Sequence, residues 1–383
     1  MQLEKQVAAE FRKGAREGKV VRSRLRESWG FQRDPLREDP PIREVFTDRE
    51  EASLRLARAL GRSSTGEPEV LACVGPLGIG VSALLRVVHE SLKSAGATEG
   101  ILLQGNRFTE EVPPPQEDTE TDEPVQTYFE VALRGVDFTK ITYVIIDDAD
   151  EIASYLSGYL DQIRAKSGAY RSPVTIVVGM HIMGWLSIPS ETRENLAEQI
   201  WLSPLSQDNL AKLVLNRLHW AKGNTDLSPL TERGVKRIAE LSMGVPWAVV
   251  ALLHSVVWEC ATRGLDRAPD ALVDEVARAR GILVLESMLQ LTTTPDPVRG
   301  RVLSHLAKNP SGGTSTVVAA SLGLNRTTVN YHLSILEGNA AVRKERRGRE
   351  VYYVPTDAGR VAIELGLTRG LAPEVSLWKS VAA

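Results

Sequence analysis

VLACVGPLGIGVSALLRVV, residues 70–88, decides the fold class of this chain. A short apolar run predicts a buried strand, a glycine-rich turn follows it, and an amphipathic pattern then opens a helix. This order is typical of the phosphate-binding loop G-x-x-x-x-G-K-[ST], in which backbone N–H groups and a helix N-terminus bind phosphates. The stretch therefore predicts a nucleotide-binding loop, whose candidate residues are Gly75, Gly78, Gly80, Val81 and Ser82.

The loop departs from its pattern at one position, because Val81 stands where the lysine belongs. That lysine supplies the positive charge that reaches the β- and γ-phosphates, and valine cannot replace it. The pattern thus predicts the fold more strongly than it predicts catalysis. A glycine-rich turn that binds no nucleotide is the alternative interpretation, since glycine tolerates the required backbone angles.

The bulk composition indicates an ordinary globular protein of two or three domains, with 383 residues, 43% hydrophobic and 25% charged. The net charge of −3 means that any affinity for nucleic acid must come from local patches. Two cysteines, Cys73 and Cys260, exclude a disulfide framework and a cysteine metal cluster. No apolar run reaches the length of a membrane span, so we expect a cytoplasmic, nucleoid-associated protein that contacts no membrane.

A second strand pattern, ITYVIIDDADEI (residues 141–152), ends in carboxylates. In P-loop proteins such a strand end carries an aspartate that helps to hold Mg²⁺ and an acid that activates water. Asp147 fits the metal position together with Ser82, provided that a magnesium nucleotide binds. Asp148 fits the catalytic position but is one methylene shorter than the usual glutamate, so we expect catalysis by this pair to be impaired. His181 ends a later strand, where a histidine more often has a structural role than a sensor role.

Residues 28 to about 280 resemble the AAA+ modules of archaeal origin-recognition and initiator ATPases and the related transposition-adaptor ATPases. The resemblance rests on FTDRE (46–50), the loop Gly75–Ser82, DDAD (147–150), LSPLSQDNLAKLVLNRL (202–218) and GVPW (244–247). It implies a parallel P-loop sheet with a helical lid. It also implies ATP or ADP with Mg²⁺ as cofactor, and the alternative is that the module binds no cofactor. Initiators usually offer a sensor arginine near position 246, where this chain has Pro246-Trp247. With Val81 and Asp148, three catalytic positions depart together, which predicts a module that has lost most or all hydrolysis.

Residues 297–356 carry the most specific functional pattern. Two helical stretches are followed by NRTTVNYHLSILEG (325–338) after a turn short enough for a helix-turn-helix. Two strands around a basic turn, Arg343 to Arg349, complete a winged-helix pattern that resembles bacterial and archaeal regulators. We expect DNA contacts from the third helix and the wing, through Arg326, Thr327, Thr328, Asn330, Tyr331, Arg343, Lys344, Arg346, Arg347 and Arg349. A protein-interaction role for the winged helix is the alternative.

These patterns predict an α/β class fold: an AAA+-like parallel sheet with a helical lid, then a winged helix-turn-helix. The expected parts are a basic arm at 1–27, the AAA+-like core at 28–200, the lid at 201–285, the winged helix at 290–356 and a helix and tail at 357–383. Within the core, residues 109–124 form a proline-rich acidic loop, which is either simply solvated or masks a basic face.

Three functions fit the sequence. The leading hypothesis is a protein of initiator-like build, in which a degenerate AAA+ module positions a winged helix on double-stranded DNA. The second is a DNA-dependent ATPase that remodels DNA or a partner. The third is a transcription regulator whose AAA+ module senses a ligand or is purely structural. Self-association, or pairing with another AAA+ protein, is a further partner hypothesis, and replication and transcription are both open.

Overall fold

The computed structural model describes residues 14–15, 18–33, 46–63, 69–96, 98–112, 126–169, 174–283, 297–309 and 311–371. The chain divides into two compact units, Asp48–Ser203 and the remainder, each of which is described by itself. Most of the predicted acidic loop and basic arm lies outside the described residues, as does the tail beyond position 371.

The first unit is built on a five-stranded parallel sheet with the strand order β2-β5-β6-β1-β7. Its strands are β1 (Val70–Gly75), β2 (Glu99–Gln104), β5 (Ile141–Asp147), β6 (Thr175–His181) and β7 (Glu198–Trp201). Every residue of β1 is buried, and β5 and β6 are buried almost throughout. Such continuous apolar runs are expected of strands covered on both faces. Because the five strands are parallel, their carboxyl ends lie at the same edge of the sheet, where ligands bind in open α/β sheets.

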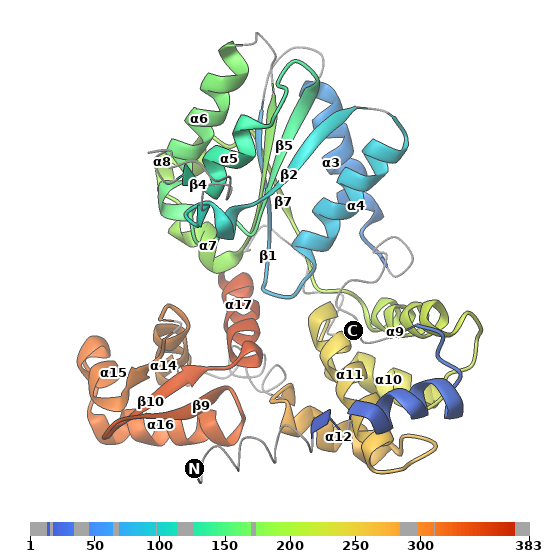
Figure 1. The fold of residues 1–383 in the computed structure, drawn as a ribbon. Coiled ribbons are helices and arrows are strands. Elements are labelled where there is room, and N and C mark those ends of the chain that lie inside the picture. The colour runs from blue at the N-terminus through green and yellow to red at the C-terminus, as the bar shows by residue number, and fades with distance from the viewer. Residues whose placement is uncertain are drawn as a thin grey trace, which may run out of the picture. The chain divides into compact units, whose positions relative to one another are not determined.

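Helices cover both faces of this sheet (Figure 1). Helices α3 (Glu50–Ser63) and α4 (Val81–Ser94) lie on one side. The other side carries α5 (Tyr128–Arg134), α6 (Leu156–Ala169) and α7 (Ile182–Ser187), and the chain reaches β7 through α8 (Ser190–Glu194). A short β3–β4 pair (Glu111–Val112 with Gln126–Thr127) and the 3-10 turns η2 (Gly105–Arg107) and η3 (Ala153–Tyr155) complete the unit.

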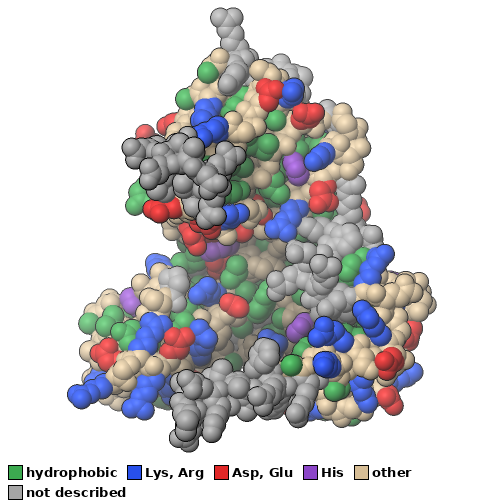
Figure 2. Space-filling view, in the orientation of Figure 1, with side chains coloured by type: hydrophobic (Ala, Val, Ile, Leu, Met, Phe, Trp, Pro, Cys, Tyr) green, Lys and Arg blue, Asp and Glu red, His purple; other side chains and the backbone are tan. Residues whose placement is uncertain are grey.

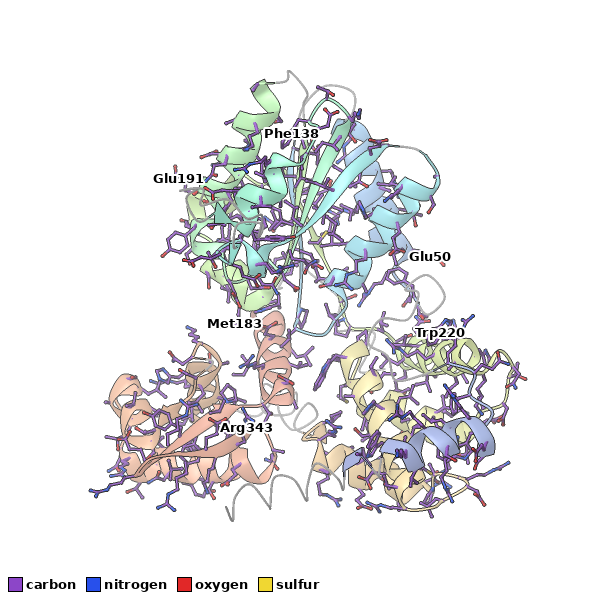
Figure 3. All side chains as sticks on the ribbon, viewed as in Figure 1. Glu50, Phe138, Met183, Glu191, Trp220 and Arg343 are labelled. Carbon is purple, nitrogen blue, oxygen red and sulfur yellow. The ribbon has the colours of Figure 1, made fainter. Side chains whose placement is uncertain are left out.

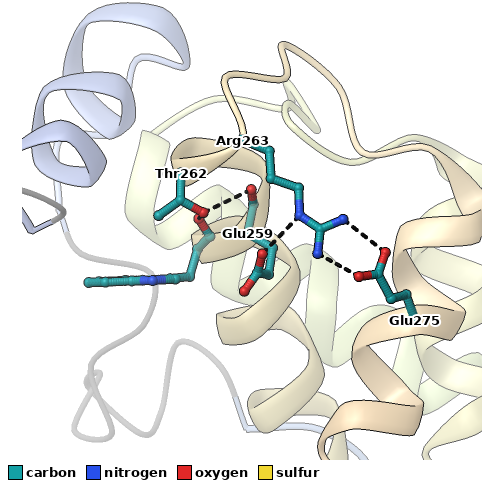
Figure 4. A network of polar contacts seen from close by, with 5 residues as sticks. Glu259, Thr262, Arg263 and Glu275 are labelled. Carbon is teal, nitrogen blue, oxygen red and sulfur yellow. Dashed lines mark hydrogen bonds and ion pairs between the residues drawn. The ribbon is translucent and has the colours of Figure 1, made fainter. Parts of the chain in front are cut away.

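The second unit contains a helical block formed by α9 (Gln207–Lys222), α10 (Glu232–Leu241), α11 (Pro246–Thr262) and α12 (Asp270–Ala279). The Ser206 side chain caps α9 as its sequence predicts, and proline begins α11. Arg263 fastens α11 to α12 through a bidentate pair with Glu275, at 2.8 and 2.6 Å, while its Nε donates to Glu259 (Figure 4). The block thus has the short helices and the caps that the sequence indicates for residues 201–285.

Residues 18–33 pack against this helical block. The segment includes η1 (Arg24–Ser28), and the Trp29 indole donates to the Asp266 carbonyl at 3.1 Å. Phe31 lies 4.8 Å from the Lys222 ammonium, which is fully buried and pairs with Asp226. Arg33 stacks on Trp220 of α9, a residue labelled in Figure 3. Residues 29–33, which follow the predicted basic arm of 1–27, thus contact the helical block through aromatic rings and cations.

The winged helix consists of α14 (Pro297–Ala307), β8 (Gly313–Thr314), α15 (Ser315–Leu322), α16 (Arg326–Gly338), β9 (Val342–Arg347) and β10 (Glu350–Pro355). Helix α17 (Asp357–Leu371) follows it. Buried apolar side chains from the three helices form its core, among them Leu303, Leu306, Val318, Leu333 and Leu336. Gly323 ends α15 in the left-handed conformation and the Asn325 side chain caps α16, so the helix-turn-helix forms as the sequence predicts.

Two local expectations need correction. The wing was predicted as a basic turn from Arg343 to Arg349, but Arg343, Lys344, Arg346 and Arg347 lie within strand β9, and only Gly348 and Arg349 form the turn. Strand β7 was not predicted, and the chain was expected to turn helical without it.

Among the described residues, no helix is both long and apolar enough to cross a membrane.

Candidate functional site

The glycine loop, Gly75–Gly80, joins β1 to α4 and needs its glycines for physical reasons. A side-chain carbon added at Gly75 would lie 2.6 Å from Ile79 Cγ2 and 3.2 Å from Leu202 Cβ. Gly78 and Gly80 have φ of +77° and +103°, a region that favours glycine. Gly80 is the N-cap of α4 and provides no side-chain cap, so the first N–H groups of the helix are available to an anion.

Val81 directs its side chain toward the sheet. Its Cγ1 lies 3.2 Å from where a side-chain carbon on Gly179 of β6 would be, and the methyl Cδ1 of Leu85 comes closer still. Gly179 therefore leaves the space in which α4 seats two apolar side chains. The position that carries the phosphate-binding lysine in the P-loop pattern is thus used for packing.

Asp147 and Ser82 come together at the carboxyl end of β5, as the sequence predicts. Asp147 is 0% exposed, its Oδ1 accepts from the Asp148 N–H at 3.1 Å, and its Oδ2 has no hydrogen-bond partner among the described residues. Burial and the charge of Asp148 raise the pKa of Asp147, while a hydrogen bond from Ser82 and the charge of Arg86 oppose that shift. A buried carboxylate that lacks a partner on one oxygen is suited to a cation.

This pair fits Mg²⁺, which prefers oxygen ligands and is usually held by one or two protein groups together with substrate phosphates. Ser82 and Asp147 would provide the protein ligands, and the N–H groups at the start of α4 would bind the phosphates. The described residues contain no cluster of three or more His, Cys, Asp or Glu side chains that could bind a metal alone. The site therefore suits a metal that arrives with phosphate.

Asp148 and Asp150 have different roles at the end of β5. Asp148 adopts φ of +52° and is half-buried. Asp150 Oδ1 accepts from the His181 N–H at 2.9 Å and lies 3.2 Å from His181 Nε2. The Asp150 carboxylate thus joins the ends of β5 and β6, which is a structural role that the sequence analysis did not assign. His181 stands where it was predicted, and its ring contacts this carboxylate.

Arg49 is a further residue of the site that sequence reasoning missed. Arg49 is only 7% exposed, and its Nη2 donates to the Ile79 carbonyl at 3.0 Å. This hydrogen bond fixes the backbone of the glycine loop at Ile79. Burial lowers the pKa of Arg49 to about 10, and the charge of Asp48 opposes this shift. The guanidinium remains charged at pH 7. FTDRE, used only as a family signature, was the available signal.

Replacing Arg49 with alanine is expected to lower the free energy of unfolding by about 1.5–3 kcal/mol, the range for a hydrogen bond to a charged group. The loop would lose the donor to Ile79 and α3 would lose buried packing. Urea unfolding followed by circular dichroism measures the effect. Arg58→Ala, on the exposed side of α3, is the control and should change stability by less than about 0.5 kcal/mol. Equal losses in both variants would contradict the role of Arg49.

The exposed face of α16 carries all five residues predicted for it: Arg326, Thr327, Thr328, Asn330 and Tyr331 are exposed, Tyr331 by 62%. Val329, Leu333 and Leu336 face the core. Two further residues that were not predicted are also exposed: Ser334 of α16 and Val317 of α15, the latter by 53%. No acidic residue occurs between Asp296 and Glu337, so the helix-turn-helix carries no negative side chain until Glu337, in the last turn of α16.

The wing cations fall into two groups. Glu345 pairs with Arg343 at 2.8 Å and with Arg347 at 2.7 Å, and Lys344 pairs with Glu337 of α16 at 2.5 Å. Bonding to Arg347, followed by the charge of Arg343, lowers the pKa of Glu345. Arg347 also stacks on Tyr352 at 4.6 Å. Arg346 and Arg349 are exposed and make no ion pair within the described part of the chain, which leaves them available to an anionic partner.

Positive charge is visible on the surface of the winged helix. Figure 2 shows Lys and Arg side chains spread over this part of the chain, and Figure 3 labels Arg343 on it. The predicted residues therefore lie on two neighbouring elements, α16 and β9 with its turn, and Glu337 and Glu345 moderate the wing. Strand alternation places Arg346 on the face of the hairpin that it shares with Lys344, the partner of α16.

Comparison with known proteins agrees with this architecture. Residues 296–345 match a family described as a helix-turn-helix domain. An uncharacterized HTH-type transcriptional regulator of Methanocaldococcus jannaschii is 23% identical over 369 residues, covering 82% of this chain and 88% of that protein.

Two solved structures are also similar. The Aeropyrum pernix ORC1 protein in complex with DNA has a TM-score of 0.52 and 19% identity, covering 88% of this chain and 97% of that one. A Thermotoga maritima RuvB variant has a TM-score of 0.48 and 17% identity, covering 89% of this chain and all of that one. The order of the strands, the likeness to ORC1 and the matched family together show an AAA+-like P-loop fold followed by a helix-turn-helix domain.

Proposed function

We propose that this chain is a transcription regulator that binds double-stranded DNA through its winged helix, while its α/β unit keeps the AAA+ shape without ATP turnover. One observation carries the DNA assignment. Apart from Glu337, which pairs with Lys344, the exposed surface of α15 and α16 offers hydrogen-bonding groups and no acidic residue, and the wing adds two arginines that make no ion pair among the described residues. Such a surface fits a polyanion such as double-stranded DNA.

The division of labour follows from where the side chains lie. Helix α16 would enter the major groove, where its N-terminal residues Arg326, Thr328 and Asn330 can contact base edges. Arg346 and Arg349 would contact phosphates or the minor groove beside it. Lys344 would contribute less, because its ammonium already pairs with Glu337.

The names of similar proteins support this assignment. The relative that matches most of this chain is named a transcriptional regulator, and the ORC1 neighbour was solved with DNA. Because the regulator is similar in sequence along most of both chains, whereas the likeness to ORC1 at 19% identity is one of fold, we favour transcription over initiation of replication. Association with the nucleoid follows from DNA binding. Self-association, and pairing with another AAA+ protein, stay predictions.

The glycine loop supports nucleotide binding better than hydrolysis. Its helix N-terminus, Ser82 and Asp147 suit a phosphate with Mg²⁺, so ATP or ADP is the cofactor that the site could hold. Val81 gives no cation, and Asp148 is shorter than the glutamate it replaces. A positioned cation is worth several powers of ten in phosphoryl transfer, so its loss is the main reason to infer that turnover is lost.

A salt titration of DNA affinity tests the proposal on the whole chain. Replacing Arg346 and Arg349 with alanine is expected to weaken binding to every duplex and to reduce the salt slope by about 0.9 per lost phosphate contact. The matched control is Arg347→Ala, whose guanidinium is already held by Glu345 and Tyr352. Its slope should change less. If the double variant keeps the wild-type affinity and slope, the wing is not a DNA contact.

A further inference from the structure

The surface of the helix-turn-helix that is proposed to contact DNA is almost uncharged. Between Thr314 and Leu336 the only charged side chain is Arg326, at the start of α16. The exposed side chains that follow on α16 are hydroxyl, amide and phenol groups: Thr327, Thr328, Asn330, Tyr331 and Ser334. His332 is buried and faces away from this surface.

Each base pair demands particular side chains in the major groove. Guanine is most often contacted by arginine or lysine, and cytosine by an acidic group. Adenine suits asparagine or glutamine, and the thymine methyl suits apolar atoms and the methyl of threonine. The exposed face of α16 provides an amide, threonine methyls and a tyrosine ring, and α15 adds Val317. Apart from Arg326 it provides no arginine, lysine or acidic group, the side chains that most often specify a G·C pair, and its hydroxyl groups suit either pair.

The wing points to the same base composition by a different route. Arg346 is exposed, makes no ion pair among the described residues, and lies on the hairpin face that Lys344 ties to α16. Narrow minor grooves, which are typical of A-tracts, attract arginine because their negative potential is enhanced. Arg346 is therefore suited to an A·T-rich segment beside the major-groove contact.

We propose that the winged helix selects A·T-rich duplex sites, with Asn330 contacting adenine and Arg326 specifying a single G·C pair at the edge of the site. This inference rests on the proposed DNA binding and adds the substrate class. Asn330 lies near the N-terminus of α16 and Arg326 begins it. The two residues are one helical turn apart on the same face, so they would contact neighbouring base pairs.

Selection of bound duplexes from a random pool by the full-length protein tests the inference. The expected result is an A·T-rich core with one G·C position. Asn330→Ala should weaken binding to the selected site about tenfold or more while leaving affinity for random duplex within twofold, in line with the value of a bidentate base contact. Asn330→Arg should move the preference at one position from A·T to G·C, which a merely structural asparagine would not do.

Asn339→Ala is the matched control, because Asn339 is an exposed asparagine at the other end of α16. It should leave the selected sequence unchanged. Enrichment of G·C-rich duplexes, or binding without base preference, would overturn the inference and leave DNA binding intact. Absence of binding to any duplex would instead overturn the proposed function. An unchanged preference in Asn330→Arg would overturn the role of Asn330.

Discussion

Glutamate at both Thr327 and Tyr331 is expected to lower the affinity of the full-length protein for double-stranded DNA by about 100-fold or more. Both side chains are exposed and stand four residues apart, so they share one face of α16. Two carboxylates there would face phosphates and base acceptors across a groove. Opposed like charges cost several kcal/mol, and about 1.4 kcal/mol corresponds to a factor of ten.

The matched control places the same charges on the α/β unit, at Ser157 and Tyr155. Tyr155 is 73% exposed and Ser157 is also exposed, so both variants gain two charges at accessible sites. Fluorescence anisotropy with labelled duplex should show the loss only for the α16 variant, and circular dichroism should show that both fold. A similar loss in the control would mean that net charge alone governs binding.

The second large effect concerns ATP. The purified protein is expected to hydrolyse ATP at the rate of a protein-free blank, with or without duplex DNA. A phosphate release assay measures this. Steady turnover that disappears in Asp147→Ala would contradict the account, because it would show a working metal site and a cation supplied from elsewhere in the chain.

Val81→Lys is the complementary variant. It returns a cation to the loop, and we expect nucleotide binding to tighten, because the ammonium can reach the β- and γ-phosphates. Turnover should stay low, since Asp148 remains at the catalytic position. The substitution also removes the packing of Val81 toward Gly179, so thermal unfolding must be measured alongside. Val81→Met, which restores length without charge, is the control and should not tighten binding.

The sequence was sufficient to predict the parts with strong local patterns. The glycine loop, the strand that ends at Asp147 and the helix-turn-helix depend on contiguous residues, and their periods and caps are readable. Strand β7 was missed because Glu198–Trp201 is too short to show a period, and it forms only by pairing with β1. The order of strands in the sheet likewise depends on contacts between distant segments.

Side-chain partners were the part of the site that local patterns could not provide. Arg49 is 30 positions from the carbonyl that it holds, and Asp150 is 31 positions from its partner His181. The sequence presents the five cations of the wing as one basic group, but three of them form ion pairs with Glu345 or Glu337. Alternation along β9 then separates Arg346 from Arg347. Which cations are paired, and which face of the strand each occupies, depends on the strand register, and the sequence alone does not show it.

The most direct test of the account is a photocross-link from the proposed DNA surface. The full-length protein would carry a benzophenone amino acid at Tyr331 or, in a second preparation, at Tyr155, which is comparably exposed on the α/β unit. After irradiation with labelled duplex at a salt concentration that permits binding, the account predicts a covalent adduct from position 331 and none from position 155. An adduct from position 155 alone would show that the α/β unit contacts the DNA and would contradict it.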